Sequence, residues 1–94
     1  MRKSIITNNW NNCYICGSTQ NLQTHHALHG YANRKQADKY GLIIPLCIYC
    51  HTSGNYAVHN NAAVDLKIKQ VAQRKFEEIY GHKKYMEIFH RNYL

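Results

Sequence analysis

The last third of the chain carries the clearest hydrophobic pattern. Within residues 60–81 the apolar positions recur every three or four residues, which places them on one side of an α-helix. They are Val64, Ile68, Val71, Ala72, Phe76 and Ile79. Asn60 or Asn61 can cap the start of this helix, and Gly81 follows its end. The pattern predicts a long amphipathic helix whose apolar side packs on the rest of the protein.

A second, shorter helix is predicted in residues 82–94. Tyr85, Ile88 and Phe89 recur at helical spacing there and are expected to face inward. The two helices together make residues 62–94 a C-terminal helical segment. We expect this segment to pack on the remainder of the chain and to enlarge its core.

The middle of the chain has the pattern of strands and turns. Residues 21–26 (NLQTHH) alternate well enough for a strand, and residues 42–46 (LIIPL) form an apolar run of strand length. Between them, residues 33–41 predict one or two helical turns that end at Gly41. This segment therefore predicts short strands joined by a helical connection.

Length and charge narrow the possibilities further. A chain of 94 residues forms one small domain, whose hydrophobic core supplies only about 3–5 kcal/mol of stability. A further cross-link is therefore expected. The 12 Lys and Arg residues exceed the 5 Asp and Glu residues, which gives a net charge of +7. A basic domain attracts polyanions, most commonly nucleic acid, although many small proteins are basic for solubility alone.

The N-terminal residues bear on the cellular compartment in which the protein is expected. Residues 1–12 are polar and rich in asparagine, which indicates a loose arm that docks through Trp10. The arm has no apolar run long enough for a signal peptide, and no segment is suited to span a membrane. We therefore expect a cytoplasmic protein without a membrane partner. Thiols stay reduced in the cytoplasm, which favours a bound metal over disulfides.

The four cysteines form two C-x2-C pairs, with residues 17–46 between them. They are Cys13 and Cys16, then Cys47 and Cys50. Four thiolates in such pairs match the tetrahedral coordination of structural zinc sites, and Gly17 permits a tight turn after the first pair. The long interval predicts a hairpin inserted between two zinc knuckles. Zinc binding can contribute about 10–16 kcal/mol to folding, which supplies the missing stability.

Histidines gather in and near the same segment. They are His25, His26, His51 and His59. His51 directly follows Cys50, so the second knuckle sets its position. Adjacent residues of a strand point to opposite faces, so His25 and His26 are not expected to bind one ion side by side. Either the strand bends there, or one histidine binds a metal while its neighbour has another task.

The order of these motifs resembles that of the HNH, or ββα-metal, endonucleases. The chain contains "CYIC", "HH", "LIIPLC" and "CIYCH" in the family's order. Within that family, it more closely resembles a group of small phage proteins related to the phage recombination-enhancement nucleases. Further matches to that group are "ANRK" at 32–35, "KYGL" at 39–42 and "VHNN" at 58–61. The resemblance covers residues 13–61, and the C-terminal helices are compatible with the same group.

The resemblance implies a role for each histidine. His25 and His51 would be ligands of a catalytic divalent ion, which is Mg²⁺, Mn²⁺, Ni²⁺ or Zn²⁺. His26 would be the general base. His59 would be a third ligand or a phosphate contact. A free imidazole has a pKa near 6.5 and can accept a proton at neutral pH, which suits the role of base.

The resemblance says less about the remaining polar residues of this segment. The usual position of the middle asparagine of the HNH pattern is Leu42 here, and Asn33 is the candidate to replace it. Arg34, Lys35 and Lys39 could hold the DNA backbone, or each could belong to an ordinary solvated face.

The predicted protein is a small α+β zinc-stabilised domain. Its core in residues 13–61 is a ββα-metal, treble-clef-like hairpin between two zinc knuckles, followed by two C-terminal helices. The resemblance implies a phage-encoded, metal-dependent DNA endonuclease that leaves 5′-phosphate and 3′-hydroxyl ends. Such an enzyme would act in DNA processing or recombination, with a phage recombination, packaging or replication protein as a further candidate partner. Two alternatives stay open: a non-catalytic zinc module that binds nucleic acid or a phage or host protein, and an RNA nuclease.

Overall fold

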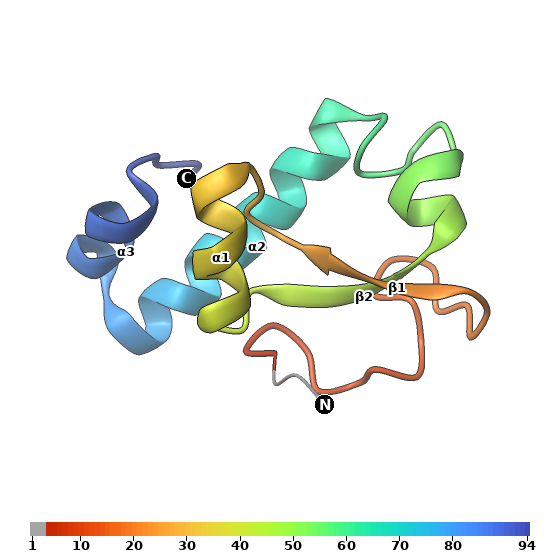
Figure 1. Ribbon diagram of the computed structural model, residues 1–94, viewed down its shortest axis with the longest axis horizontal. Helices are drawn as coiled ribbons and strands as arrows, with labels where there is room; N and C mark the ends of the chain where they lie inside the picture. The colour runs from red at the N-terminus through yellow and green to blue at the C-terminus, as the bar shows by residue number, and fades with distance from the viewer. Residues whose placement is uncertain (1–3) are drawn as a thin grey trace.

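The computed structural model describes residues 4–94, with every side chain in that range except that of Tyr31 (Figure 1). Its elements, in chain order, are β1 (Leu22–His26), α1 (Tyr31–Lys39), β2 (Ile43–Cys47), the π-helical turn η1 (Tyr49–Ser53), α2 (Ala62–Tyr80) and α3 (His82–Phe89). This is the predicted small α+β arrangement of a two-stranded hairpin with helices. The first three residues of the predicted N-terminal arm lie outside the described range.

The hairpin lies between the two cysteine pairs, as the long interval between them predicted. Strand β1 pairs antiparallel with β2, so that Leu22 lies opposite Cys47 and His26 lies opposite Ile43. All five residues of β2 are buried. Gly41 has a φ of 74° between α1 and β2, which lets the chain turn directly from the helix into the strand.

The segment that precedes the first cysteine runs along the outer edge of β2 (Figure 1). The backbone N–H of Ile5 donates to the carbonyl of Gly41 at 2.9 Å. The hydroxyl of Ser4 donates to the carbonyl of Ile43 at 2.6 Å. Within residues 4–12 the arm is thus tied down by hydrogen bonds rather than loose, and it covers a strand edge that would otherwise expose unpaired backbone groups.

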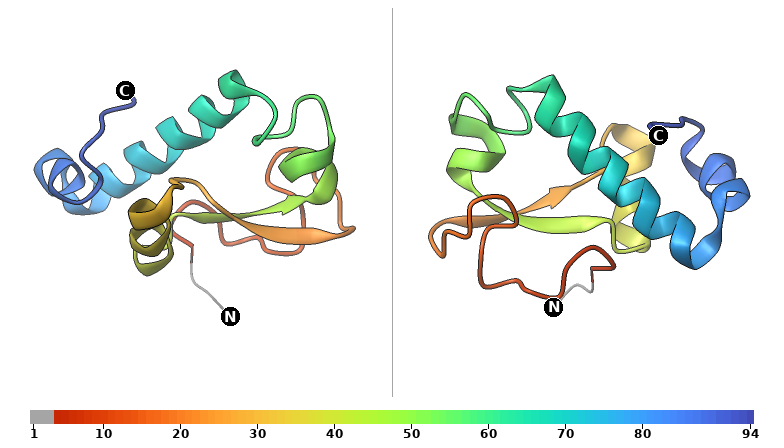
Figure 2. Two further views of the ribbon diagram at one scale, coloured as in Figure 1. Left: turned by 45° about the horizontal axis from the view of Figure 1, so that its top comes forward. Right: turned by 180° about the vertical axis from the view of Figure 1, so that it is seen from behind.

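Helix α2 crosses the hairpin and runs from the η1 end of the molecule to α3 (Figure 2). It begins as predicted, because the side chain of Asn61 accepts hydrogen bonds from the N–H groups of Ala63 and Val64. It ends at Gly81, which has a φ of 88°. None of the helices within residues 4–94 is both long enough and apolar enough to cross a membrane.

Of the apolar positions predicted on α2, Ile68, Ala72 and Phe76 are buried, and Val64 and Val71 are partly buried. The prediction for Ile79 was wrong, because this side chain is 58% exposed. At this end Phe76 packs inward, with ring centroids 5.9 Å from Tyr85 and 5.6 Å from Phe89 of α3. Ile79 does not belong to this core cluster.

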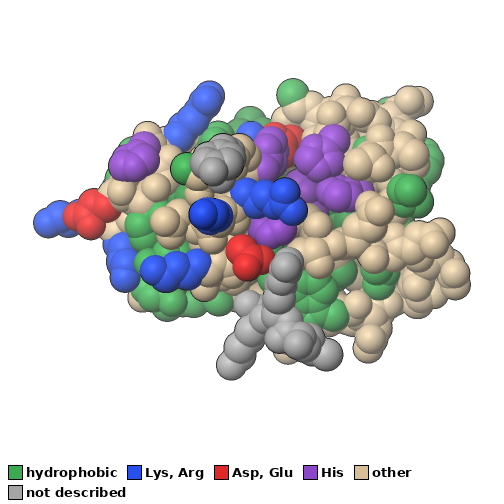
Figure 3. Space-filling model, in the orientation of Figure 1, with side chains coloured by type: hydrophobic (Ala, Val, Ile, Leu, Met, Phe, Trp, Pro, Cys, Tyr) green, Lys and Arg blue, Asp and Glu red, His purple; other side chains and the backbone are tan. Residues whose placement is uncertain are grey.

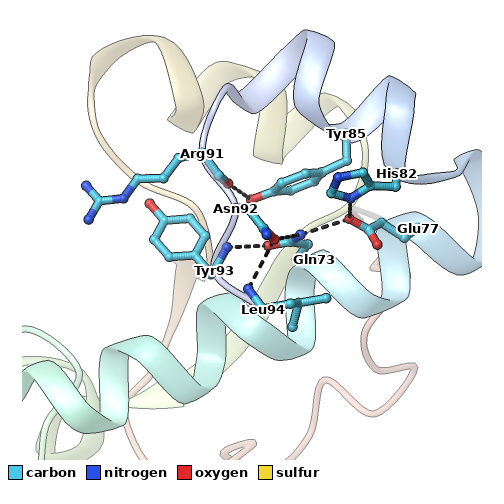
Figure 4. A network of polar contacts seen from close by, with 8 residues as sticks. All are labelled: Gln73, Glu77, His82, Tyr85, Arg91, Asn92, Tyr93 and Leu94. Atoms are coloured by element: carbon cyan, nitrogen blue, oxygen red, sulfur yellow. Dashed lines mark hydrogen bonds and ion pairs between the residues drawn. The ribbon is translucent and has the colours of Figure 1, made fainter.

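A buried polar residue joins the C-terminal residues to α2 (Figure 4). Gln73 is 0% exposed. Its Nε2 donates to Oε2 of Glu77 at 2.8 Å and to Oδ1 of Asn92 at 2.7 Å, while its Oε1 accepts from the N–H of Tyr93 at 2.8 Å. Because both ends of the amide are satisfied, its burial is tolerated. The periodicity of apolar positions gives no sign of such a residue.

Candidate metal centres

The four predicted zinc ligands come together beside the hairpin. Their sulfur atoms all lie within 4.8 Å of one another, and those of Cys16 and Cys47 are 3.6 Å apart. Two thiolates bound to one tetrahedral zinc ion at about 2.3 Å would lie about 3.8 Å apart. None of the four cysteines forms a disulfide. The cluster could therefore hold a structural metal such as zinc, in agreement with the sequence prediction.

Local backbone geometry shapes both cysteine pairs. In the first, the N–H of Cys13 donates to the carbonyl of Ser18 at 2.7 Å, and the N–H of Gly17 donates to the carbonyl of Cys13 at 2.9 Å. Gly17 has a φ of 80°, so the expectation of a glycine turn is confirmed. In the second pair, the N–H of Cys50 donates to the sulfur of Cys47 at 3.5 Å.

The cysteine thiols differ in acidity. Burial by itself raises the pKa of Cys13, but backbone hydrogen bonds, the largest from Cys16, outweigh it and lower the pKa to about 6. Burial and then the neighbouring sulfurs raise the pKa of Cys50 well above its usual range. Four packed sulfurs cannot all lose their protons without a cation among them. This donor set fits zinc, which binds cysteines as thiolates.

Three histidines from separate segments form a second cluster. They are His25 at the end of β1, His51 in η1 and His59 in the loop before α2. Each offers one ring nitrogen, and the three nitrogens lie within 4.8 Å of one another. The Nε2 atoms of His51 and His59 are 3.1 Å apart. Two imidazoles bound to one tetrahedral zinc ion at about 2.0–2.1 Å would have nitrogens about 3.3 Å apart, so this geometry fits a divalent ion.

The most buried member of this histidine cluster is His25, at 2% exposure. Within residues 4–94, its Nε2 is a buried side-chain nitrogen with no hydrogen-bond partner. Burial and then the neighbouring His51 and His59 lower the pKa of His25 to about 3. The ring is therefore neutral at physiological pH, which is the form that binds metals. Because an unsatisfied buried nitrogen costs free energy, a ligand on Nε2 would relieve that cost.

A glutamine orients the second histidine of the cluster. Residues two apart on a strand point to the same face, so Gln23 lies on the same face of β1 as His25. The Nδ1–H of His51 donates to Oε1 of Gln23 at 2.7 Å. This bond leaves the Nε2 lone pair of His51 available, as the outer partner of a metal-binding histidine commonly does. Burial and then His59 lower the pKa of His51, which further favours the neutral ring.

His26 lies beside the cluster and has a different partner. Its Nε2–H donates to Oδ1 of Asp38 on α1 at 3.1 Å. Its side chain is 10% exposed, against 42% for Asp38. The adjacent His25 and His26 thus make separate interactions, one within the histidine cluster and one with a carboxylate.

A further histidine–carboxylate pair escaped the sequence prediction. The Nε2–H of His29 donates to Oδ1 of Asp65 at 3.0 Å, and the amine of Lys69 lies 2.7 Å from Oδ2 of the same carboxylate. Burial alone raises the pKa of Asp65, but the hydrogen bonds from Lys69 and His29 outweigh it and lower that pKa. The ring of His29 is 5.7 Å from that of His59. Helix α2 is thereby connected to the edge of the histidine cluster.

An open cleft of about 800 Å³ lies over the histidine cluster. It is lined by Thr24, His25, His26, His29, Gly30, Arg34, Lys35, Asp38, His51 and His59. Figure 3 shows histidine side chains gathered near the middle of this face, with Lys and Arg side chains beside them. Among the predicted DNA-contacting residues, Arg34 and Lys35 border the cleft. Asn33 is not among the described residues that line it, and the amine of Lys39 lies instead over the ring of Tyr40, 5.4 Å from its centroid.

The chain was compared with models of known protein families, with curated proteins and with solved structures, and none of them matched. Its function is therefore inferred from the two clusters, from the cleft and from the residues that border it.

Proposed function

We propose that this protein is a metal-dependent endonuclease of the HNH type, which hydrolyses phosphodiester bonds in DNA. The observation that carries the proposal is the convergence of three ring nitrogens, from His25, His51 and His59, beneath an open cleft. A zinc-stabilised binding domain has no need of such a set. The motif order in residues 13–61 supports the same conclusion, as does the net charge of +7.

In this function the three histidines hold a divalent ion, and His26 acts as the general base. When bound, the ion stabilises negative charge on the phosphate and on the leaving oxygen. Because Nε2–H of His26 donates to Asp38, its Nδ1 carries the lone pair that accepts a proton. Asp38 holds the ring in this tautomer and stabilises the imidazolium that forms.

The hydrolysis consumes one water molecule for each phosphodiester bond and needs no other co-reactant. A water molecule gives one proton to Nδ1 of His26, and its oxygen attacks the phosphorus. The bond from phosphorus to the 3′ oxygen breaks, and that oxygen takes a proton from solvent. His26 then releases its proton to solvent, which restores the neutral ring. The products are the 5′-phosphate and 3′-hydroxyl ends that the family resemblance implies. A phage origin and a role in DNA processing or recombination belong to the same proposal.

The decisive experiment is the nicking of supercoiled plasmid by the purified protein. We expect relaxed circles with Mg²⁺, Mn²⁺, Ni²⁺ or Zn²⁺ and none with EDTA. His51→Ala should abolish nicking. His82→Ala is the matched control and should cut like the wild type. His82 also donates a hydrogen bond from Nδ1 to a side-chain oxygen, that of Glu77 at 2.7 Å, but it lies on α3 and does not line the cleft. DNA binding without cleavage under every ion would instead establish the non-catalytic zinc module.

The basic border of the cleft provides a second test. Binding should weaken steeply with salt, because cationic side chains release counterions from DNA. Arg34→Ala combined with Lys35→Ala should lower affinity for all sequences alike, and the salt slope should fall by about one for each phosphate that these side chains neutralise in the wild type. Lys39→Ala should have a smaller effect, since Lys39 does not line the cleft. Equal effects of all three residues would contradict this placement of the DNA.

A further inference from the structure

Within residues 4–94, charged side chains are confined to part of the molecule. Residues 4–33 and 40–64, which contain both cysteine pairs, have no Lys, Arg, Asp or Glu. In Figure 3, the charged side chains among the described residues gather on one side of this face, and the other side shows none of them. DNA phosphates are bound mainly by cations. The uncharged half therefore offers a DNA backbone little attraction, and any contact it makes with nucleic acid must be of another kind.

This uncharged half exposes aromatic rings on the segment that carries two of the cluster histidines. Tyr49 is 61% exposed and Tyr56 is 73% exposed. Exposed aromatic rings serve as stacking platforms for unpaired bases, whose flat faces are apolar and uncharged. Chemically, such a surface complements a base and not a phosphate.

The ring of Tyr49 is supported on one side by a glycine. A Cβ added at Gly54 would lie 2.9 Å from Cζ of the Tyr49 ring and 2.6 Å from the Tyr49 carbonyl oxygen. Only glycine allows the chain to approach the ring this closely. The N–H of Gly54 also donates to that carbonyl at 2.9 Å. The ring is thus held in place against the backbone while most of its surface stays exposed, which lowers the entropy lost when a base stacks on it.

Both tyrosines lie on the segment that supplies two of the cleft histidines. Tyr49 precedes His51 by two residues and Tyr56 precedes His59 by three. Because consecutive Cα atoms are about 3.8 Å apart, these pairs of Cα atoms are separated by at most about 8 and 11 Å. Two or three nucleotides cover that distance at the rise of about 3.4 Å per nucleotide of a DNA strand. A strand with one phosphate in the cleft would therefore carry its neighbouring bases within reach of this segment.

We propose that Tyr49 and Tyr56 stack on unpaired bases of the strand that occupies the histidine cleft, so that the preferred substrate is single-stranded or locally opened DNA. The proposal rests on the proposed function for the placement of that strand. Arg34 and Lys35 hold phosphates at the charged border of the cleft, and the uncharged half receives the bases. Intact duplex offers these rings no base face, because its bases are stacked on one another.

The test is a binding measurement without added divalent ion, so that no cleavage occurs. Fluorescence anisotropy would compare a 12-nucleotide single strand with an abasic strand of the same length and charge, and with a duplex. We expect the base-bearing strand to bind roughly tenfold or more tightly than the abasic strand, as stacking of one or two bases allows. Tyr49→Ala and Tyr56→Ala should each reduce this preference, whereas Tyr49→Phe and Tyr56→Phe should retain it.

Each outcome of the binding measurement supports or overturns base stacking on the two tyrosines. Equal affinity for the two single strands, or a preference that survives both alanine variants, overturns the proposal. A third result would also overturn it: the wild type is a dimer in analytical ultracentrifugation, and Tyr49→Ala dissociates the dimer without changing DNA affinity. The tyrosine surface would then bind a second copy of the chain. Thermal unfolding and zinc content of each variant show whether its fold is intact, and the phenylalanine variants carry the test where an alanine variant fails to fold. Plasmid nicking is measured separately. Base binding without cleavage would therefore refute the proposed nuclease function and leave the stacking proposal standing.

Discussion

The cysteine cluster and the histidine cluster differ in the number and origin of their ligands. Four sulfurs come from two short knuckles, and three of the four cysteines are buried. Three imidazole nitrogens come from β1, η1 and the following loop, and they lie beneath an open cleft. Four ligands complete a tetrahedron, whereas three leave a position for water or substrate. The same fold thus provides one closed site suited to stability and one open site suited to chemistry.

The largest expected effect is the loss of the fold when the closed site is broken. Cys47→Ser removes one of four thiolates, and zinc binding supplies about 10–16 kcal/mol to small domains of this kind. The hydrophobic core supplies only about 3–5 kcal/mol. We therefore expect unfolded or insoluble protein, measured by circular dichroism and by zinc content. A cooperative thermal transition in reduced, metal-free wild type would show that the cysteine metal is dispensable.

The open site should behave in the opposite way. His25→Ala should abolish cleavage and weaken binding of the second ion, because a metal ligand contributes at least the 10–100-fold that even outer partners supply. The protein should still fold and keep one equivalent of zinc, although the cavity left by this buried ring lowers its stability. Isothermal titration with Mn²⁺ and elemental analysis measure the two sites separately. Loss of both ions in this variant would mean that the two clusters are not independent.

Substitution of His26 should affect proton transfer without affecting metal binding. His26→Ala should keep both ions and its affinity for DNA, yet lose cleavage by about 10²–10⁴-fold, the usual contribution of a general base. Asp38→Asn should lose less, because it changes the partner of the ring and keeps the ring itself. Single-turnover nicking rates measure both variants. Full activity of His26→Ala would exclude it as the base, and loss of metal would make it a ligand.

The contrast between the clusters also explains what could be predicted from the sequence. The cysteine pairs, the hairpin between them and the cap at Asn61 depend on short-range spacing, which periodicity and motif patterns reveal. The partners of the cleft histidines are distant: Gln23 meets His51 across 28 residues, and Asp65 meets His29 across 36. Only the fold brings such pairs together. The burial of Gln73 was missed for the same reason, because its partners Asn92 and Tyr93 lie 19 and 20 residues further along the chain. The exposure of Ile79 also has no sign in the periodicity, which gives this residue the same standing as the buried positions.

The smallest predicted effect concerns acid. The pKa of His25 falls from its ordinary 6.5 to about 3 in the folded protein, chiefly through burial. Below pH 6.5 the unfolded chain therefore binds a proton at His25 that the folded chain does not bind. The stability associated with the neutral ring is complete above this pH and declines as pH falls toward 3, by up to about 1.4 kcal/mol for each pH unit.

Urea unfolding of the wild type and of His25→Gln, between pH 7.5 and 5.5 without added divalent ion, isolates this contribution. Both proteins share the cysteine site, so protonation of thiolates affects them alike, whereas the glutamine side chain cannot take up a proton. The free energy of unfolding of the wild type should therefore fall more steeply with acid than that of the variant. Parallel curves would show that the ring of His25 reaches water in the folded protein, and the histidine cluster would then lack the buried, neutral ligand that distinguishes it from an ordinary surface group of histidines.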